Sequence, residues 1–520
     1  MTRKKIDSPP AMNEIGNDTK SLLRGSVILV AGRIFALVVN FGVQVATIRY
    51  LPKAEYGILA FAISVVGAVS VVCLLGLDKT AGRYLSVYIE KNDSRRFWGS
   101  AVFSFVVVSV LGFASAISLL IAYWWEYSVF DLSGETMLIL AVVSGLVVAE
   151  SLNCLFEAFF AALGNVRSIF MRRHILSPLL KIIAAFIVII LEGNLWEFAT
   201  GQLLAGLIGT LICVPITWRV IRLPQTPPWP GFFQLILPVR KIMLHGGSML
   251  IGDLGFLLRG AIIPILIGIY FEATEVADYQ SVFSLARLNQ FVLLTFSILF
   301  IPHAARLSER GNIPEMQSLF ESATLWIMIL SFPFFSITFL GGDLLPILLF
   351  GGDYRSSGSI LGWLAIAFFV NAAFGTSLRL IRAVGQVKNL VFADIMVTLF
   401  SLLVSLSLIP RFGALGAAYS MLASYLFQAM VYQIWAYRFT SVNPFSMRII
   451  APFLIGVVFC LGMRSVLEQW QLTDSFGILA AILVSAIILI LFAKKLAIED
   501  AFPELGKLPF FSGKIQSTQE

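Results

Sequence analysis

The chain has 520 residues, of which 58% are hydrophobic and 13% are charged, and its formal net charge is +7. A soluble domain carries about 25% charged residues, so this composition excludes a soluble globular protein and indicates an all-α polytopic membrane protein. Basic loops on the cytoplasmic side account for the positive charge of such a chain, and we therefore expect no nucleic acid among its partners.

Apolar segments of about 20 residues recur along most of the chain, which is the length at which a helix crosses the hydrocarbon core of a bilayer. We predict about fourteen transmembrane helices from them. In chain order these spans lie near 24–46, 57–77, 98–122, 136–163, 173–191, 196–218, 242–269, 276–302, 318–340, 357–384, 389–409, 413–438, 447–466 and 475–494.

The loops between the spans alternate in charge. Lysine and arginine gather in the N-terminal tail, in the loops after the second, fourth and sixth spans, and in the C-terminal tail, whereas 123–135 and 270–278 contain carboxylates and no lysine or arginine. By the positive-inside rule both termini are expected to be cytoplasmic. No small-residue cleavage site follows the polar N-terminal tail, so we expect the first span to be retained.

Two short phrases indicate an internal repeat. Ala162–Arg167 (ALGNVR) returns as Ala383–Lys388 (AVGQVK), and each is a glycine-centred basic turn after a long apolar segment. Spans one to six fall on spans seven to twelve when they are shifted by about 222 positions. Because the shift moves an even number of spans, the copies share one orientation and predict two parallel six-helix lobes.

The predicted organisation therefore has six parts. They are a cytoplasmic tail (1–23), an N-terminal six-helix lobe (24–222), a proline-rich cytoplasmic linker (223–241), a C-terminal six-helix lobe (242–440), two additional transmembrane helices (441–495) and a cytoplasmic tail (496–520).

Three spans each place an arginine within a polar face, and a charge at the bilayer centre costs about 2.5–3.5 kcal/mol or more. Such faces are expected to turn towards a shared water-filled cavity, and surplus guanidinium groups favour a phosphate-bearing anion. The residues are Arg33, Asn40 and Gln44 in span one, Ser248, Gly252 and Arg259 in span seven, and Gln280, Ser284 and Arg287 in span eight.

Other charges within spans have two interpretations each. Glu150, Glu157, Asp253 and Asp394 either form structural pairs, for example with Lys181, or bind a coupling proton or sodium ion. Arg379 and Arg382 lie near the cytoplasmic end of their span, where long side chains reach the interface, and a cavity position is the alternative for them. The sequence does not choose between these interpretations.

Metal chemistry has little support in the sequence. Cys73, Cys154, Cys213 and Cys460 lie in apolar segments without a CxxC pair, and we interpret them as small buried residues. The three histidines share no ligand spacing. We expect no cofactor and no metal, and since the chain contains no Walker loop, we expect no use of ATP by this polypeptide.

Two short motifs lie after the first span and at the end of the second, Thr47–Gly57 (TIRYLPKAEYG) and Leu75–Tyr84 (LGLDKTAGRY). The first is similar to the "aR-x-L-x-x-x-x-yG" signature, and the second to the "lGl…a…R" segment, of the oligosaccharide-flippase branch of the multidrug/oligosaccharidyl-lipid/polysaccharide exporter superfamily. The Gly164 and Gly385 turns match the family's paired turns. The resemblance covers spans one to twelve, and the last two spans match by topology alone.

The resemblance implies a flippase and not an enzyme, in the inner (cytoplasmic) membrane of a bacterium. Its implied substrate is an undecaprenyl-pyrophosphate-linked oligosaccharide, which two lobes around a central cationic cavity would move to the outer leaflet by alternating access. The implied partners are this glycan, membrane lipid, a polysaccharide polymerase and glycosyltransferases, in pathways to O-antigen or exopolysaccharide. By position, Arg33, Arg259 and Arg287 correspond to the family's cavity arginines, whereas Arg49 matches the signature arginine and has an interfacial anchor as its alternative.

Three rival functions remain at this point. A cation-coupled exporter of drugs or organic cations predicts an acidic cavity, whereas a polymerase or lipid-linked glycosyltransferase commonly needs a large outward loop with catalytic groups. The outward loops of this chain are short. A scaffold within a synthesis complex predicts that the intramembrane arginines tolerate substitution.

Overall fold

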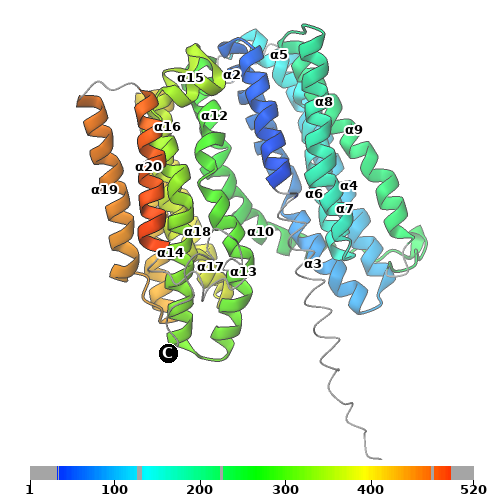
Figure 1. Ribbon diagram of the computed structural model, residues 1–520. Helices are drawn as coiled ribbons and strands as arrows, with labels where there is room; N and C mark the ends of the chain where they lie inside the picture. The colour runs from blue at the N-terminus through cyan, green and yellow to red at the C-terminus, as the bar shows by residue number, and fades with distance from the viewer. Residues whose placement is uncertain (1–31, 33, 126–131, 223–225, 470–473, 494–520) are drawn as a thin grey trace, which may run out of the picture. The chain divides into compact units, whose positions relative to one another are not determined.

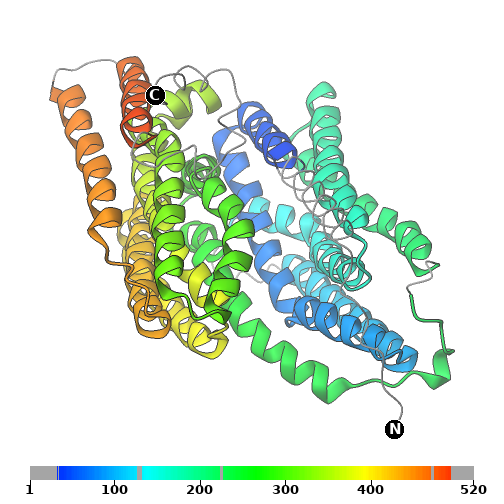
Figure 2. The ribbon, with the colours of Figure 1, turned by 60° about the horizontal axis from the view of Figure 1, so that its bottom comes forward.

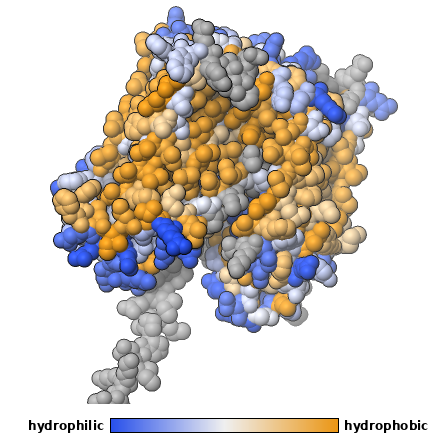
Figure 3. Space-filling model, turned by 180° about the vertical axis from the view of Figure 1, so that it is seen from behind, coloured by the Kyte–Doolittle hydropathy of each residue, from blue (hydrophilic) through white to orange (hydrophobic). Residues whose placement is uncertain are grey.

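The computed structural model describes residue 32 and residues 34–125, 132–222, 226–469 and 474–493. Over these residues every regular element is a helix, as expected from the composition (Figure 1). In the space-filling view of Figure 3, hydrophobic residues (orange) cover the middle of the face shown, and hydrophilic residues (blue) gather above and below them. This distribution is the one that a bilayer imposes, because only a helix satisfies every backbone polar group within hydrocarbon.

The chain divides into two compact units. Unit 1 contains residues 1–50, 69–127 and 138–249, and unit 2 contains residues 51–68, 128–137 and 250–520. The boundary falls within helix α2 (Lys53–Leu74), whose N-terminal part packs in unit 2 and whose C-terminal part packs in unit 1.

Unit 1 is built from helices whose most deeply buried side chains are aromatic. Phe97, Phe159 and Phe160 form its main cluster, together with smaller apolar residues. Its helices are Ile34–Tyr50, α3 (Leu77–Glu90), α4 (Ser94–Trp124), most of α5 (Gly134–Val143), α6 (Gly145–Ala162), α7 (Val166–Phe170), the π-helix η1 (Met171–Leu176), α8 (Ser177–Ile190), α9 (Leu195–Ile221), the 3₁₀ turn η2 (Phe232–Gln234) and the first half of α10 (Val239–Gly260).

Unit 2 contains the remaining helices and two larger apolar clusters, one that includes Phe320 and Tyr432 and one around Phe335. Within it α14, α16 and α20 pack side by side (Figure 1). Its helices are α11 (Ile262–Tyr270), α12 (Ala273–Arg287), α13 (Gln290–Glu309), α14 (Ile313–Leu340), α15 (Leu344–Phe350), the 3₁₀ turn η3 (Gly352–Tyr354), α16 (Ser357–Phe374), α17 (Thr376–Ala383), α18 (Val387–Thr440), α19 (Met447–Gln469) and α20 (Asp474–Ala493).

Within the described residues each of the predicted spans coincides with a helix or a helix pair, and the first span is described as a continuous helix only from residue 34. Among the described residues nine helices are long and apolar enough to cross a membrane, or ten if the bent pair α12 and α13 is counted as one span. The 52-residue helix Asn389–Thr440 contains two predicted spans, and Ile34–Tyr50 and Phe476–Ile487 are shorter apolar helices at the first and last spans.

Several spans that the sequence predicts as continuous are broken in the structure. The seventh is divided at Ala261 and the tenth at Gly375, and the eighth bends by 43° between α12 and α13. The longest helix, α18, contains a break at Gly413 (φ 57°, ψ −134°), after which its second half folds back on the first. The two halves contact each other where the Phe400 and Phe427 rings stack at 4.1 Å.

The glycine turns of the predicted repeat have the same backbone conformation. Gly164 and Gly385 have φ values of 67° and 80°. Asn165 N–H donates to the Phe160 carbonyl (2.9 Å) and Gln386 N–H to the Ile381 carbonyl (3.3 Å). This pattern is a Schellman motif, which needs a left-handed residue after the helix and so favours glycine.

Candidate functional site

Unit 2 contains a polar cavity of about 560 Å³ within its membrane-spanning helices. Among the described residues its lining includes three arginines, Arg287, Arg379 and Arg382, and one carboxylate, Asp394. The other polar lining residues are amides and hydroxyls: Ser64, Gln280, Gln290, Asn371, Tyr425, Gln428 and Tyr432. Three cations against one anion make the cavity attractive to an anionic ligand, and the neutral groups supply hydrogen bonds around it.

A break in the tenth span places two of these arginines. Helix α16 ends at Gly375, where an added Cβ would lie 2.6 Å from the Leu293 side chain, and α17 begins at the next residue. Arg379 and Arg382 are three residues apart on α17 and therefore share one face of the helix. Both line the cavity, which is the second of the two positions that the sequence left open for them.

The Arg379 guanidinium is held in place by two contacts within unit 2. Its Nε donates to Ser297 Oγ of α13 at 3.0 Å, and Nη1 donates to the Gly375 carbonyl at 2.8 Å. These contacts fix the plane of the guanidinium but leave donors available, since the group has five N–H bonds. No described carboxylate forms an ion pair with Arg287 or Arg382.

Asp394 is held by the other half of α18. Tyr432, which is almost fully buried, donates its hydroxyl to Asp394 Oδ1. The aspartate thus lies beside the arginines as an acceptor that is already hydrogen bonded, and its charge offsets only part of theirs. Asp394 therefore has a hydrogen-bonding partner, Tyr432, and also lines the cavity.

The sequence-predicted residues of unit 2 fall into three groups. Gln280, Arg287 and Asp394 line the same cavity, whereas Ser284 and Asp253 do not contribute to its lining. The side chain of Arg259 lies outside the described residues, and Gly252 has open space where a Cβ would lie. The side chain of Ser248, which belongs to unit 1, also lies outside the described residues.

The predicted residues of unit 1 are described separately. Arg33 lies outside the described residues. Asn40 donates from Nδ2 to the Ala36 carbonyl of its own helix at 2.6 Å, Gln44 is partly buried, and Arg49 is exposed at the end of that helix. The assignment of these residues to a substrate cavity therefore stays a prediction.

The carboxylates of the fourth span have basic neighbours in unit 1. Glu157 forms an ion pair with buried Arg172 (2.5 Å) and a longer one with Arg173 (3.7 Å). Glu150 lies within electrostatic range of Lys181. Glu157 thus pairs with an arginine of the π-helix η1, and Lys181, the example that the sequence offered for a span-four glutamate, lies near Glu150. No group of three histidine, cysteine, aspartate or glutamate side chains that could hold a metal ion occurs in the described part of the chain.

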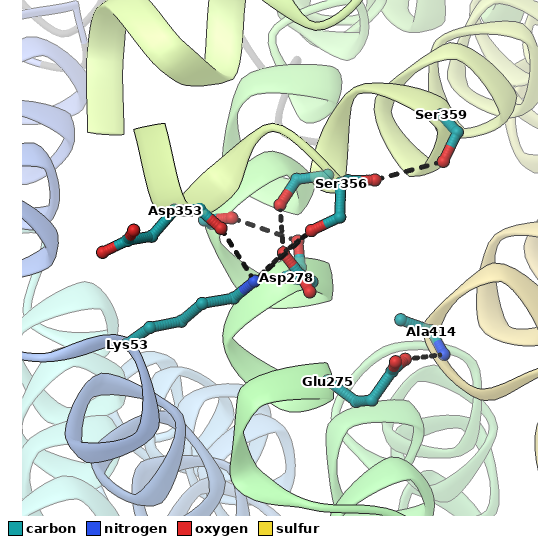
Figure 4. A network of polar contacts seen from close by, with 9 residues as sticks. Lys53, Glu275, Asp278, Asp353, Ser356, Ser359 and Ala414 are labelled. Atoms are coloured by element: carbon teal, nitrogen blue, oxygen red, sulfur yellow. Dashed lines mark hydrogen bonds and ion pairs between the residues drawn. The ribbon is translucent and has the colours of Figure 1, made fainter. Parts of the chain in front are cut away.

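A second polar network joins α2, α12 and the start of α16 at one end of unit 2 (Figure 4). Lys53 Nζ lies 2.8 Å from Asp278 Oδ1 and donates to the Asp353 carbonyl at 2.9 Å. The same Asp278 oxygen accepts hydrogen bonds from Ser356 (3.1 Å) and Ser357 (2.5 Å). The network gives one oxygen of a buried carboxylate three polar partners, at the end that the charge pattern assigns to the outer side.

Two neighbours complete this end of unit 2. Lys53 lies 5.3 Å from the ring centroid of Tyr354, a cation–π contact. Burial, together with nearby Tyr56, Asp278 and Asp353, raises the pKa of the Tyr354 hydroxyl, so this group stays neutral. Glu275, one turn before Asp278, accepts the Ala414 N–H at 2.9 Å and caps the second half of α18 (Figure 4).

Comparison with known families decides the membership of the chain. The family model described as "Polysaccharide biosynthesis protein" matches residues 22–308, more than half of the sequence. The chain belongs to this family. Together with the relatives below, the match makes it a membrane flippase or transporter of the multidrug/oligosaccharidyl-lipid/polysaccharide exporter (MOP) superfamily, as the signature residues indicate.

Two curated relatives are archaeal. The chain is 21% identical over 405 residues to the uncharacterized membrane protein MJ1068 of Methanocaldococcus jannaschii, which covers 76% of this chain and 79% of the relative. It is also 21% identical over 320 residues to the probable low-salt glycan biosynthesis flippase Agl15 of Haloferax volcanii, over 59% of this chain and 64% of the relative.

Solved structures show the same fold. The lipid II flippase MurJ, in an inward closed conformation, matches with a TM-score of 0.66 at 14% identity and covers 92% of this chain and 99% of its own. A MATE-family multidrug resistance transporter of the MOP superfamily, in an inward-facing conformation, matches with a TM-score of 0.63 at 14% identity, over 80% and 98%. The prediction of an all-α polytopic transporter fold is confirmed.

Sequence reasoning missed part of the cavity lining. It did not assign Gln290, Asn371, Tyr425 or Gln428 to any site, and it left Arg379 and Arg382 between two positions. One signal was available, because Arg379 and Arg382 are three residues apart within an apolar span. The break at Gly375 that turns them into the cavity is not readable from the sequence, since a glycine inside an apolar segment more often permits close helix packing.

Proposed function

We propose that the protein moves a polyprenyl-pyrophosphate-linked oligosaccharide from the inner to the outer leaflet by alternating access, with undecaprenol as the lipid. The unit 2 cavity supports this proposal most directly, because three arginines and one carboxylate line it. A diphosphate carries two or more negative charges, and planar guanidinium groups match its oxygen atoms in charge and geometry. The names of the curated flippase relative and of the MurJ structure agree with a lipid-linked substrate.

In this proposal the residues have distinct roles. Arg287, Arg379 and Arg382 bind the diphosphate, and the amides and tyrosines of the lining hydrogen bond the sugar hydroxyls. At about 560 Å³ the cavity lies within the range of small-molecule sites and holds a head group with part of a glycan. The binding energy offsets the cost of removing charged and hydroxyl groups from water, which is the barrier to lipid flipping. Arg33 and Arg259 are further candidate ligands.

Coupling to a cation is a separate proposal. Asp394 contacts Tyr432 and lies in the same cavity as the arginines, so protonation of the carboxylate would increase the net positive charge around the ligand. Glu150, Glu157 and Asp253 lie outside that cavity lining. A proton or sodium ion therefore acts at Asp394 in this proposal, where it changes the affinity for the anion directly.

The test uses a deletion strain and purified protein. Arg287→Gln, Arg379→Gln and Arg382→Gln are each expected to abolish complementation of surface glycan and to leave lipid-linked repeat units on the inner leaflet, while protein abundance stays normal. Each charge-assisted hydrogen bond contributes about 1.5–3 kcal/mol, so affinity for a polyprenyl diphosphate should fall about tenfold or more per substitution. Arg411→Gln, which removes an exposed arginine outside the cavity lining, is the matched control.

Three outcomes would contradict the proposal. Full complementation by all three cavity variants would remove the anion site. Tighter binding of organic cations by the arginine variants, with no change in surface glycan after deletion of the gene, would instead favour a cation exporter of the same superfamily. Accumulation of single repeat units on the outer surface would indicate a polymerase.

A further inference from the structure

The connection between α9 and α10 in unit 1 exposes large apolar side chains in a region that the charge pattern places on the cytoplasmic side. Residues 226–238 have no regular secondary structure apart from the short turn η2, and Figure 2 shows this path leading into α10. Phe233 is fully exposed (102% of its reference area) and Phe232 is 69% exposed. Trp229, Ile236 and Leu237 are exposed on the same short segment.

The α9–α10 connection packs against the start of α4. The exposure of its apolar residues is therefore not a result of loose packing. Trp98 Nε1 donates to the Pro227 carbonyl at 2.9 Å, and the Trp98 and Trp229 rings lie 5.0 Å apart. Further along, Ile236 N–H donates to the Arg95 carbonyl at 3.3 Å. An added Cβ on Gly99 would lie 2.1 Å from the Ile236 carbonyl oxygen, so the two backbones are in close contact.

Between these fixed points the two phenylalanines project from a tight turn. Their rings contact each other edge to face, with centroids 6.3 Å apart. Water solvates such an aromatic pair poorly, and transfer of the rings to an apolar phase lowers their free energy. The apolar groups and the backbone contacts therefore present one rigid hydrophobic projection at the end of unit 1.

The charges around this projection are mostly positive. Arg95, Arg96, Arg222, Arg240 and Lys241 are exposed at the ends of α4, α9 and α10. Among the described residues where α3 meets α4, the carboxylates are Glu90, which is exposed, and Asp93, which accepts the Arg96 N–H and pairs with its guanidinium at 3.4 Å. The excess of cations is complementary to an anionic surface.

The projection also continues the lipid-facing side of α9. Leu211, Val214 and Trp218 are exposed along that helix, and Trp218 is followed one turn later by Arg222, whose guanidinium lies 5.2 Å from the indole centroid. A tryptophan with a neighbouring arginine at the end of a membrane-spanning helix is typical of the bilayer interface. The α9–α10 connection therefore begins where α9 reaches the bilayer interface.

We propose that the α9–α10 connection anchors unit 1 to an anionic lipid surface, with Phe232 and Phe233 inserted at the boundary between head groups and acyl chains. The surrounding arginines and Lys241 bind lipid phosphate groups. Aromatic insertion combined with several basic residues is the usual composition of an interfacial anchor. This role concerns the fixed position of unit 1 at the membrane surface and does not depend on the transported substrate.

The experiment measures the depth of a spin label on the full-length protein. Cys73, Cys154, Cys213 and Cys460 are first replaced by alanine, and Phe233→Cys is then labelled in nanodiscs of phosphatidylglycerol and phosphatidylethanolamine. The label should collide several-fold more with oxygen, which concentrates in lipid, than with a water-soluble nickel complex. Glu90→Cys, an exposed acidic position at the same end of unit 1, is the control and should show the opposite ratio.

A second variant tests the part played by charge. Arg240→Gln combined with Lys241→Gln should reduce the immersion of the label at position 233 in anionic nanodiscs, and so should replacement of the anionic lipid by phosphatidylcholine. Equal aqueous accessibility at positions 233 and 90 would overturn the proposal. A label shielded from both oxygen and nickel would also overturn it, because protein and not lipid would then cover the phenylalanines.

Discussion

Lys53 and Asp278 form an ion pair of 2.8 Å within unit 2, with only 18% and 10% of their side chains accessible. The pair connects the segment that follows the first span to α12, in the second half of the sequence. The same lysine contacts the Asp353 carbonyl and Ser356, so that one side chain links α2, α12 and the turn before α16. In an alternating-access protein such a contact between distant parts of the chain is expected to form in one state and to break in another.

We predict that Lys53→Met destabilises the protein more than Lys53→Met combined with Asp278→Asn. Removal of one partner of a buried pair costs about 3–5 kcal/mol, because it leaves an uncompensated charge, whereas the double variant removes both charges. Thermal unfolding in detergent would measure the difference. Arg355→Met, which breaks the exposed Arg355–Asp343 pair of the same unit, should change stability by less than about 1 kcal/mol. An unchanged Tm for Lys53→Met would show that the pair contributes nothing in this state.

We predict that Gly57→Ala is strongly destabilising, since an added Cβ would lie 1.8 Å from the Ala273 carbonyl oxygen at the start of α12. The backbones of α2 and α12 must then separate, and overpacking costs about 1–3 kcal/mol or more. Gly67→Ala on the same helix is the matched control, because nothing lies within 4 Å of its Cβ position. The control should be neutral or slightly stabilising, as alanine is the better helix former. Similar unfolding temperatures for the two variants would count against the close approach.

These residues show how far the sequence could predict the structure. Gly57 is the last residue of the signature segment, which could be recognised in the sequence. The reason for a glycine at this position is a tertiary contact with the Ala273 carbonyl, which the sequence does not show. The spans were predictable from length and apolarity alone, because the bilayer sets both. The Gly164 and Gly385 turns were also predictable, since a left-handed residue after a helix favours glycine.

The candidate site was less accessible to sequence reasoning. The polar face of the eighth span places Gln280 and Arg287 in the lining of one cavity, because residues seven apart on one helix share a face. Arg379 and Asp394 come together with them only through the break at Gly375 and the reversal of α18 at Gly413. Such breaks depend on packing against other helices, and the residue pattern of a single span carries no information about that packing.

We predict that Gly413→Ala disrupts the reversal of α18. The residue has φ 57° and ψ −134°, a conformation that costs a non-glycine residue about 1–3 kcal/mol, and its Cβ would lie 2.7 Å from Glu275 Oε2. The same carboxylate caps Ala414, so the clash also disturbs the cap. Gly462→Ala in α19, where nothing lies within 4 Å of the added Cβ, serves as the control in a thermal unfolding assay. Glu275→Ala should cost about 0.5–2 kcal/mol through the lost cap alone, and a Gly413→Ala protein as stable as the control would contradict the strained turn.

We predict that Arg379→Lys keeps the fold but loses affinity for a polyprenyl diphosphate. The guanidinium donates to Ser297 Oγ and to the Gly375 carbonyl while further N–H groups remain for a ligand, and a lysine cannot present a planar fork in this way. Affinity should fall about tenfold, in line with one lost charge-assisted hydrogen bond. Binding to purified protein and complementation of a deletion strain would both measure the effect.

A second substitution separates charge from geometry at this position. Ser297→Ala keeps the charge of Arg379 and removes one of its two anchors, so it should weaken binding less than Arg379→Lys and leave the unfolding temperature nearly unchanged. A neutral hydrogen bond of this kind contributes about 0.5–1.5 kcal/mol. If Arg379→Lys binds the diphosphate as tightly as the unmodified protein, the cavity recognises only charge. The fixed plane of the guanidinium would then have no part in selecting the substrate, and Lys and Arg should be interchangeable at positions 287 and 382 as well.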